Sequence, residues 1–422
     1  MSIKEDGNWR AFRHRNYRIL YGANALSNIG SWAQRIAQDW LVLELTNNSG
    51  TALGLVTALQ FAPVLLFSLQ GGALADRVNK RSALVWTNVG SFIFALLLGV
   101  LVISKNVEMW HVYFCAIGLG VASAVDAPIR QSFNGEVVGK KDLGNALSLN
   151  SANFNAGRLI GPAVSGFLIA QYGTGPSFLI NALSYIFVIA ALMVLREKDF
   201  FIADKKETQG TIREGMAYVS ARPDLYVIML IVFFAATFGL NFQIFNALMA
   251  TTVFGKGPAS FGLLGTYIAI GSLSGALISA RLEKHRNTLF VIKMAAAFAS
   301  SILVLSIAPN YLVYSLLLPI CGVTALVTMI TANTTIQTKS DASIRGRVTG
   351  LYLLIFMGGT PFGSPLIGWA AEHIGTRQTI ALCASIALVA IITIWTIYRD
   401  RVEAPTSIAV ESVLESAYED KS

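Results

Sequence analysis

The sequence predicts an all-α membrane protein whose twelve transmembrane helices form two similar six-helix halves. Hydrophobic residues make up 54% of the 422 residues and charged residues only 13%, against about 25% charged in a typical soluble domain. Apolar runs recur along the chain, each close to the roughly 20 residues that cross a hydrocarbon core. The glycine pattern of the first half also returns in the second. These observations exclude an ordinary soluble enzyme.

Apolar runs bounded by charged and turn residues give the expected spans. Helices are expected because the runs lack the alternating pattern of a membrane barrel. The segment from Trp9 to Arg18 is too basic, and the run after it too long, for a cleaved signal peptide. The expected spans are residues 17–45, 51–74, 83–103, 110–130, 144–170, 177–195, 225–252, 259–281, 288–308, 311–333, 347–371 and 377–398.

Basic residues set the expected orientation. Of the 32 Lys and Arg residues, 27 lie in the two terminal segments and in every second loop, whereas the alternate loops hold only Lys105, Lys256 and Arg377. The positive-inside rule therefore predicts that both termini are cytoplasmic. The expected organisation is an N-terminal half at 1–195, a cytoplasmic linker at 196–224 with a short helix at 212–221, a C-terminal half at 225–398 and a cytoplasmic tail at 399–422.

Glycines repeat between the halves at steps of four and five residues, and Pro162 accompanies the first set. Such glycines let a neighbouring helix approach closely, and a proline can bend the span. Two halves of the same topology imply a pseudo-twofold axis along the membrane normal, with a site between them, as in transporters. Helix packing without a direct role in transport is the alternative. The glycines are Gly157, Gly161 and Gly166, and, 202 residues later, Gly359, Gly363 and Gly368.

Several stretches resemble the major facilitator superfamily. Residues 71–81, Gly-Gly-Ala-Leu-Ala-Asp-Arg-Val-Asn-Lys-Arg, are similar to its signature between spans 2 and 3, with Asn79 where the family usually has Gly. Residues 30–40, 126–131, and 145–150 running into 157–162 resemble the drug and siderophore exporter branch, which includes the enterobactin exporter and macrolide efflux proteins. The resemblance implies the major facilitator fold and export by alternating access, commonly in exchange for protons.

Six charged residues are candidates for a cytoplasmic gate. After span 2, a carboxylate could approach the positive end of a helix in the other half, with basic residues beside it. At the inner end of span 4, opposite charges four residues apart flank Pro128. Membrane anchors and an ordinary helix exit are the alternatives. The candidates are Asp76, Arg77, Lys80, Arg81, Asp126 and Arg130.

Polar residues in spans 1 and 5 form a candidate substrate and proton pathway. In span 1 they recur at steps of four and three and share one helix face. A charge near the bilayer centre costs about 3 kcal/mol on insertion scales, so Asp39, which can pair with Arg35, is either proton-sensitive or part of a static ion pair. Arg158 could attract an anionic substrate or pair with a carboxylate. The pathway residues are Asn24, Asn28, Ser31, Arg35, Gln38, Asp39, Asn155 and Arg158.

The second half carries fewer charges. Span 7 places Asn241 and Gln243 among phenylalanines, and span 10 places Thr328 and Thr331 on a face lined with threonines. Amides, hydroxyls and aromatic faces favour a large, partly apolar ligand over a small ion. Hydroxyls that bond to their own helix backbone, and aromatic residues that face the core or lipid, are the alternatives.

The sequence predicts a secondary active transporter in the cell membrane, a proton-coupled exporter of a small amphipathic compound such as a drug, a macrolide or a siderophore. Uptake, lipid movement and a non-transporting sensor or scaffold are the alternatives. The chain shows no nucleotide-binding loop, no positioned nucleophile and no metal-binding spacing among its four histidines. No enzyme activity, cofactor, metal or nucleic-acid partner is therefore expected. The three cysteines, Cys115, Cys321 and Cys383, lie in apolar runs and should pack in the core. The sequence does not fix the oligomeric state, and a monomer is one of the possible states.

Overall fold

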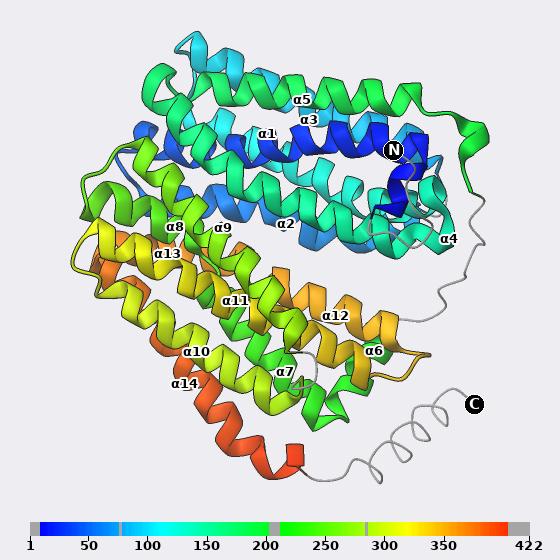
Figure 1. The fold of residues 1–422 in the computed structure, drawn as a ribbon. Coiled ribbons are helices and arrows are strands. Elements are labelled where there is room, and N and C mark those ends of the chain that lie inside the picture. The colour runs from blue at the N-terminus through cyan, green and yellow to red at the C-terminus, as the bar shows by residue number, and fades with distance from the viewer. Residues whose placement is uncertain (1–8, 76–77, 202–211, 283–285, 404–422) are drawn as a thin grey trace. The chain divides into compact units, whose positions relative to one another are not determined.

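The structure is a computed structural model that describes residues 9–75, 78–201, 212–282 and 286–403, and the regular elements in these ranges are all helices. Figure 1 traces the helices, which divide into two compact units. Unit 1 comprises Met1–Lys206 and Asn246–Ala269, and unit 2 comprises Glu207–Phe245 and Ile270–Ser422. Residues 246–269 therefore belong with unit 1, although they lie in the second half of the chain.

Long helices make up most of both units. Unit 1 contains the short helices η1 (Arg10–Arg13) and η2 (Glu197–Asp199), with α1 (Arg15–Leu45), α2 (Gly50–Ala75), α3 (Lys80–Ile103), α4 (Met109–Tyr172), α5 (Gly175–Val194) and η4 (Met249–Val253). Unit 2 contains α6 (Ile212–Ser220), α7 (Pro223–Phe234), η3 (Ala235–Gly239), α10 (Thr288–Ser306), α11 (Tyr311–Lys339), α12 (Arg345–Gly358), α13 (Thr360–Ile374) and α14 (Thr376–Glu403). Two helices, α8 (Phe242–Leu248) and α9 (Pro258–Arg281), contribute to both units.

Ten helical segments of the described residues are long and apolar enough to cross a membrane, and each of the twelve predicted spans coincides with helical structure. Two spans are divided between consecutive helices: residues 225–252 between α7, η3, α8 and η4, and residues 347–371 between α12 and α13. The two numbers differ for two reasons. Helix α4 counts as one segment but contains two predicted spans. They lie on either side of Gly139, where the backbone leaves helical geometry with a φ of 70° and a ψ of 168°. Helix α1 has the length of a span, 31 residues, but its polar residues leave it outside the apolar set.

Asparagines begin three of the helices. The Asn79 side chain accepts a hydrogen bond from the Ser82 amide at 3.0 Å, and Asn287 and Asn310 do the same at the starts of α10 and α11. An asparagine in this position satisfies one of the amides that a helix leaves unpaired. Asn79, which replaces the usual glycine of the resembling motif, therefore starts α3.

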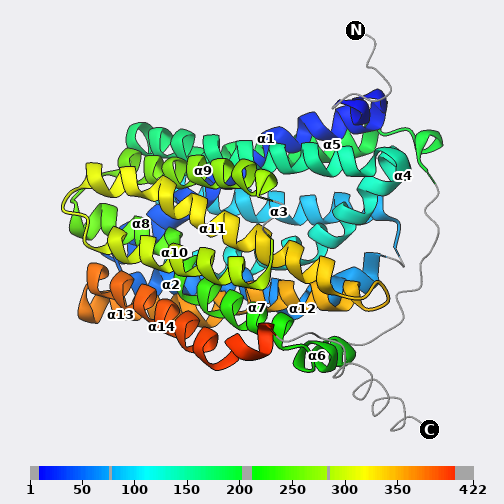
Figure 2. The same cartoon turned by 60° about the horizontal axis from the view of Figure 1, so that its bottom comes forward.

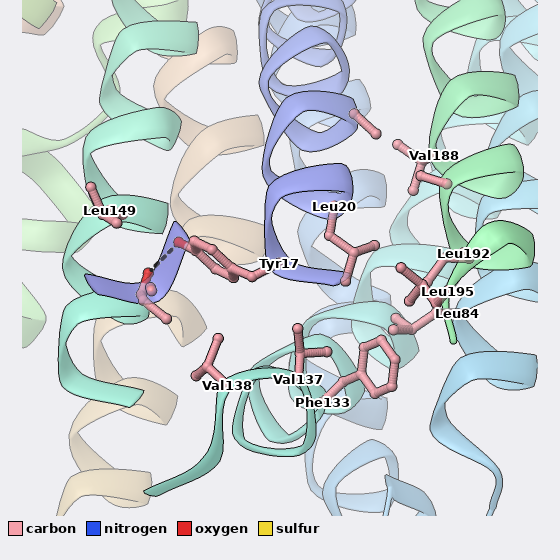
Figure 3. Close-up of a cluster of buried hydrophobic side chains, with 14 of the residues drawn as sticks. Tyr17, Leu20, Leu84, Phe133, Val137, Val138, Leu149, Val188, Leu192 and Leu195 are labelled. Carbon is pink, nitrogen blue, oxygen red and sulfur yellow. Dashed lines mark hydrogen bonds between the residues drawn. The ribbon is translucent and has the colours of Figure 1, made fainter. Parts of the chain in front are cut away.

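Helices α1, α3, α4 and α5 share a hydrophobic core at one end of unit 1 (Figure 3). Tyr17 and Leu20 of α1 pack with Phe133 of α4 and Val188 of α5. The Tyr17 hydroxyl donates to the Ala146 carbonyl oxygen at 3.0 Å, so this buried polar group has a partner. Helix α1 packs against both α4 and α5.

In unit 2, α10 packs against α11 and α14, and the short helix α6 packs against α12 (Figure 2). The Arg347 guanidinium contacts the Glu214 carboxylate at 2.6 Å, and the Tyr218 hydroxyl donates to Asp341 at 3.1 Å. Burial raises the pKa of the Tyr218 phenol above its ordinary value. The predicted linker helix, α6, is thus held within unit 2 by an ion pair and a hydrogen bond.

Candidate functional site

Two arginines share one indole ring in unit 1. The Arg35 guanidinium carbon in α1 lies 5.1 Å from the centroid of a Trp32 ring, and that of Arg158 in α4 lies 5.7 Å from it. Arg35 also lies 5.7 Å from the ring centroid of Phe61 in α2. The Arg35 charge acts on Arg158. Arg35 and Arg158, which the sequence proposes separately, therefore lie at the same tryptophan, and their like charges repel each other.

One carboxylate accompanies these two charges. The Asp39 residue, one turn beyond Arg35 on α1, is 2% exposed and interacts electrostatically with Arg35. Gln38 is 1% exposed, and neither polar atom of its side chain has a hydrogen-bond partner among the described residues. Leaving a buried polar group unpaired costs about 1–3 kcal/mol. The side-chain amide of Gln38 therefore has hydrogen-bonding capacity that no described residue uses.

Glycines set the level at which α4 meets α1. A Cβ atom at Gly161 would lie 2.6 Å from the Trp32 Cβ atom, and one at Gly157 would lie 2.8 Å from the Asn28 Cβ atom. Both distances are shorter than ordinary carbon contacts. The Phe154 ring lies edge-on to Trp32, 5.6 Å away. The two glycines thus allow α4 to approach α1 closely enough for Arg158 and Phe154 to contact Trp32.

Helix α5 holds the other side of α1. The Ser31 hydroxyl oxygen lies 3.4 Å from both Asn181 Oδ1 and the Tyr185 hydroxyl oxygen. Asn181 Nδ2 donates to Gln34 Oε1 at 2.6 Å. Tyr185 is also within electrostatic range of Arg35. These contacts fix the rotation of α1 about its axis and so the direction of its polar face.

A separate polar network surrounds Asp126 of α4. Arg130 Nε donates to Asp126 Oδ2 at 2.6 Å, and Arg130 Nη1 donates to Asn24 Oδ1 at 2.8 Å. Asp126 Oδ1 also accepts from the Thr87 hydroxyl at 2.8 Å and from Asn88 Nδ2 at 3.2 Å. The predicted pair of Asp126 and Arg130 is therefore formed, and it joins α1, α3 and α4 within one unit.

The basic pair that begins α3 bonds to groups of the same unit. Lys80 Nζ pairs with the Glu136 carboxylate. Arg81 donates to Glu197 Oε1, the Leu192 carbonyl oxygen and the Met193 carbonyl oxygen, each at 2.7 Å. Asp76 and Arg77 lie outside the described residues.

The remaining predicted residues of α4 serve packing or local bonding. Asn155 Nδ2 donates to the Ser151 carbonyl oxygen of its own helix at 2.8 Å. A Cβ atom at Gly166 would lie 3.0 Å from the Gly262 Cα atom of α9, and Pro162 faces Gly265 of the same helix. The second half of α4 thus packs closely between α1 and the first part of α9.

In unit 2, the repeated glycines contact the segment equivalent to span 1. Gly359 and Gly363 face Thr237, which lies in the π-helical segment η3, and Gly368 is buried. Asn241 Nδ2 donates to the Thr237 carbonyl oxygen at 2.7 Å, and its Oδ1 accepts from the Ser364 hydroxyl at 3.2 Å. Within each unit, therefore, the glycine-bearing segment packs on the first predicted span of that half.

The other two groups of unit 2 differ in their bonding. The Thr328 hydroxyl donates to the Thr324 carbonyl oxygen of its own helix at 2.7 Å, as in the alternative that the sequence left open. The Thr331 hydroxyl is buried and has no partner among the described residues. Gln243 is half-buried in α8.

Sequence reasoning missed four aromatic residues of the site. Trp32 lies one helical turn before Arg35 and Phe154 lies one turn before Arg158, whereas Phe61 and Tyr185 lie in spans 2 and 6. Spacings of three and four residues on one helix would have indicated that Trp32 and Phe154 lie near the two arginines. The other two depend on how separate helices pack, for which a single sequence carries no signal.

The described residues contain no group of three or more His, Cys, Asp or Glu side chains suited to a metal ion. Cys115, Cys321 and Cys383 are buried and form no disulfide, which agrees with the packing role expected from their apolar runs.

Solved structures share this fold. A bacterial homologue of the human lysosomal transporter Spinster, inward-facing and unoccupied, aligns with a TM-score of 0.72 at 15% identity over 92% of this chain and 97% of its own. A POT family transporter in complex with 5-aminolevulinic acid aligns with a TM-score of 0.73 at 11% identity over 92% and 97%. These likenesses show the major facilitator fold, and the predicted fold class is confirmed.

The chain belongs to the transmembrane secretion effector family, whose pattern matches residues 6–417. It is 23% identical to the staphyloferrin A transporter of Staphylococcus aureus over 86% of this chain and 92% of the relative. It is 24% identical to the multidrug efflux pump Tap of Mycolicibacterium fortuitum over 89% and 94%. The enterobactin exporter EntS of Salmonella typhi is 19% identical over 89% of each chain. The protein is a transporter of the major facilitator superfamily, and the resemblance is confirmed.

Proposed function

We propose that this protein exports a small amphipathic compound, a drug, a macrolide or a siderophore, from the cytoplasm. The observation that carries the proposal is the pair of arginines on Trp32, both within predicted spans, because a helix in lipid gains nothing from such charges without a polar ligand or path. The names of the relatives, which include efflux pumps and siderophore transporters, favour export over uptake.

Proton antiport is the proposed source of energy, with Asp39 as the group that gains and loses the proton. A buried carboxylate that acts on Arg35 changes the charge around that arginine when it is protonated. An interaction drives transport only if it differs between two states of the protein. Arg35 would therefore associate with Asp39 in one state and with substrate in the other.

The proposed cycle is alternating access between the halves 1–195 and 225–398, in the cell membrane, with both termini in the cytoplasm. Asp76, Arg77, Lys80, Arg81, Asp126 and Arg130 are the proposed gate residues. For Lys80 and Arg81 the contacts with Glu136 and Glu197 would have to rearrange during the cycle.

The test is substrate-driven proton flux in proteoliposomes of known orientation, with a panel of siderophores, macrolides and other amphipathic drugs. We expect at least one compound to move protons in wild type, and Asp39→Asn to abolish that movement while the protein remains folded. Proton flux that survives Asp39→Asn would remove Asp39 from coupling. A folded wild type that moves no compound outward would favour uptake, lipid movement or a non-transporting role.

A further inference from the structure

Arg35 and Arg158 have unused hydrogen-bond donors. A guanidinium stacked on a ring uses its flat face and keeps five N–H groups at its edge. Among the residues whose side chains the structure describes, neither arginine donates a hydrogen bond or forms an ion pair. Arg130, on the same helix as Arg158, instead donates to both Asp126 and Asn24. Arg130 therefore has partners for its N–H groups, whereas those of Arg35 and Arg158 remain available to a ligand.

The charges around Trp32 do not balance. Arg35 and Arg158 contribute two positive charges, and among the residues that the structure describes Asp39 is the one carboxylate that acts on either of them. The Arg35 charge opposes that of Arg158. Because charges interact strongly away from water, an excess positive charge at this depth favours an anion, whereas a cation would add a third like charge.

We propose that the compound carried by this transporter is an anion, and that a carboxylate or similar oxyanion on it bridges Arg35 and Arg158 beside Trp32. This inference rests on the proposed transport function and specifies its substrate class. An oxyanion accepts two parallel hydrogen bonds from a guanidinium edge, and bridging both arginines removes their mutual repulsion. The faces of Trp32, Phe61 and Phe154 then contact the apolar part of the compound.

Asp39 competes with this anion. Its carboxylate acts on Arg35, so it occupies the same positive charge that the substrate would use. Neutralising Asp39 therefore strengthens anion binding, whereas neutralising either arginine weakens it. A purely structural ion pair between Arg35 and Asp39 would not give these opposite effects on one ligand.

The binding test uses three probes that differ in charge: naphthalene-2-carboxylate, the neutral naphthalene-2-carboxamide and the cationic naphthalen-2-ylmethylammonium. Equilibrium dialysis measures their dissociation constants for the full-length protein in phosphatidylcholine nanodiscs. We expect wild type to bind the carboxylate about tenfold more tightly than the carboxamide and the cation most weakly. Equal binding of carboxylate and carboxamide, or no binding of any probe at millimolar concentration, would overturn the proposal.

Variants locate the site. Arg35→Gln and Arg158→Gln should each abolish the preference for the carboxylate, Arg158→Lys should retain part of it because the charge remains, and Asp39→Asn should increase it. Lys256→Gln removes an exposed cation of the same unit and should change nothing. If a glutamine variant fails to fold, the Arg158→Lys and Asp39→Asn variants still test the proposal through their preference for the carboxylate over the carboxamide. An unchanged preference in both variants would overturn the proposal.

The natural anion could be soluble or a lipid headgroup, and added phosphatidylglycerol distinguishes them. Displacement of the carboxylate probe by this lipid would identify a headgroup, and lack of displacement a soluble anion. The transport proposal fails separately: an intact anion preference without export in proteoliposomes would reject export alone. Export of a cationic compound that is unaffected by Arg158→Gln would reject the anion proposal alone.

Discussion

Arg130 and Arg158 lie on the same helix and have different surroundings. Arg130 has a carboxylate, Asp126, whose oxygens also accept from Thr87 and Asn88. Arg158 has an aromatic face and a second arginine nearby. Removing one partner of a buried pair is costly because the other charge is left without compensation. The two arginines should therefore respond differently to mutation of their neighbours.

Asp126→Asn should lower the free energy of unfolding by about 2 kcal/mol, the scale of hydrogen bonds to charged groups. Arg130 would retain Asn24 but lose its opposite charge. Thr87→Val, which removes one neutral donor to Asp126, should cost about half as much. Thermal unfolding of the purified variants measures both effects. An Asp126→Asn protein as stable as wild type would mean that water already screens this pair.

Close helix contacts position the site at the scale of single elements. Helix α4 carries Gly161, against which Trp32 packs, and also Gly144, where an added Cβ atom would meet nothing within 4 Å. The backbone of α1 is the near neighbour at Gly161, because the Ile29 carbonyl oxygen would lie 2.9 Å from the added atom. Backbone atoms cannot rotate away as a flexible side chain can, so α1 and α4 would have to separate.

Gly161→Ala should therefore lower stability by about 1–3 kcal/mol, the usual cost of overpacking, and should weaken binding of the naphthalene carboxylate by displacing Trp32. Gly144→Ala serves as the control on the same helix and should be neutral or stabilising by about 0.5–1 kcal/mol. Thermal unfolding and dialysis report the two effects. Normal affinity for the naphthalene carboxylate in a folded Gly161→Ala protein would show that binding does not depend on the close contact between Trp32 and position 161.

At the scale of the whole molecule, unit 1 is not a continuous piece of chain. Residues 246–269 belong to it, and Gly262 and Gly265 of α9 pack on α4 at Pro162 and Gly166. A fragment that ends at residue 206 therefore lacks part of its own packing surface.

We expect fragment 1–206 to be less stable alone than when it is expressed together with fragment 207–422. Gly262→Val in the second fragment should reduce recovery of the complex, because the Gly262 position contacts the α4 backbone. A side chain at position 257 would meet open space, so Gly257→Val should leave recovery of the complex unchanged. Co-purification and thermal unfolding measure these outcomes. Equal stability of fragment 1–206 with and without its partner would contradict the expectation.

The sequence predicted the helices well because the length and polarity that a span needs are local properties. It also placed Arg35 and Arg158 in the correct helices, since a charge inside an apolar run is visible in one dimension. It could not predict that both share Trp32, which depends on the close approach at Gly161. The association of residues 246–269 with unit 1 likewise arises from packing between distant segments.

The burial of all three native cysteines has a practical consequence. Cys115, Cys321 and Cys383 are 0%, 0% and 4% exposed, so thiol reagents that need an exposed side chain should leave them unmodified. A single cysteine introduced at an exposed position, such as Met216 or Lys256, would then be labelled selectively in an otherwise native chain. Pairs of spectroscopic labels could follow distances through the transport cycle without first removing the natural thiols.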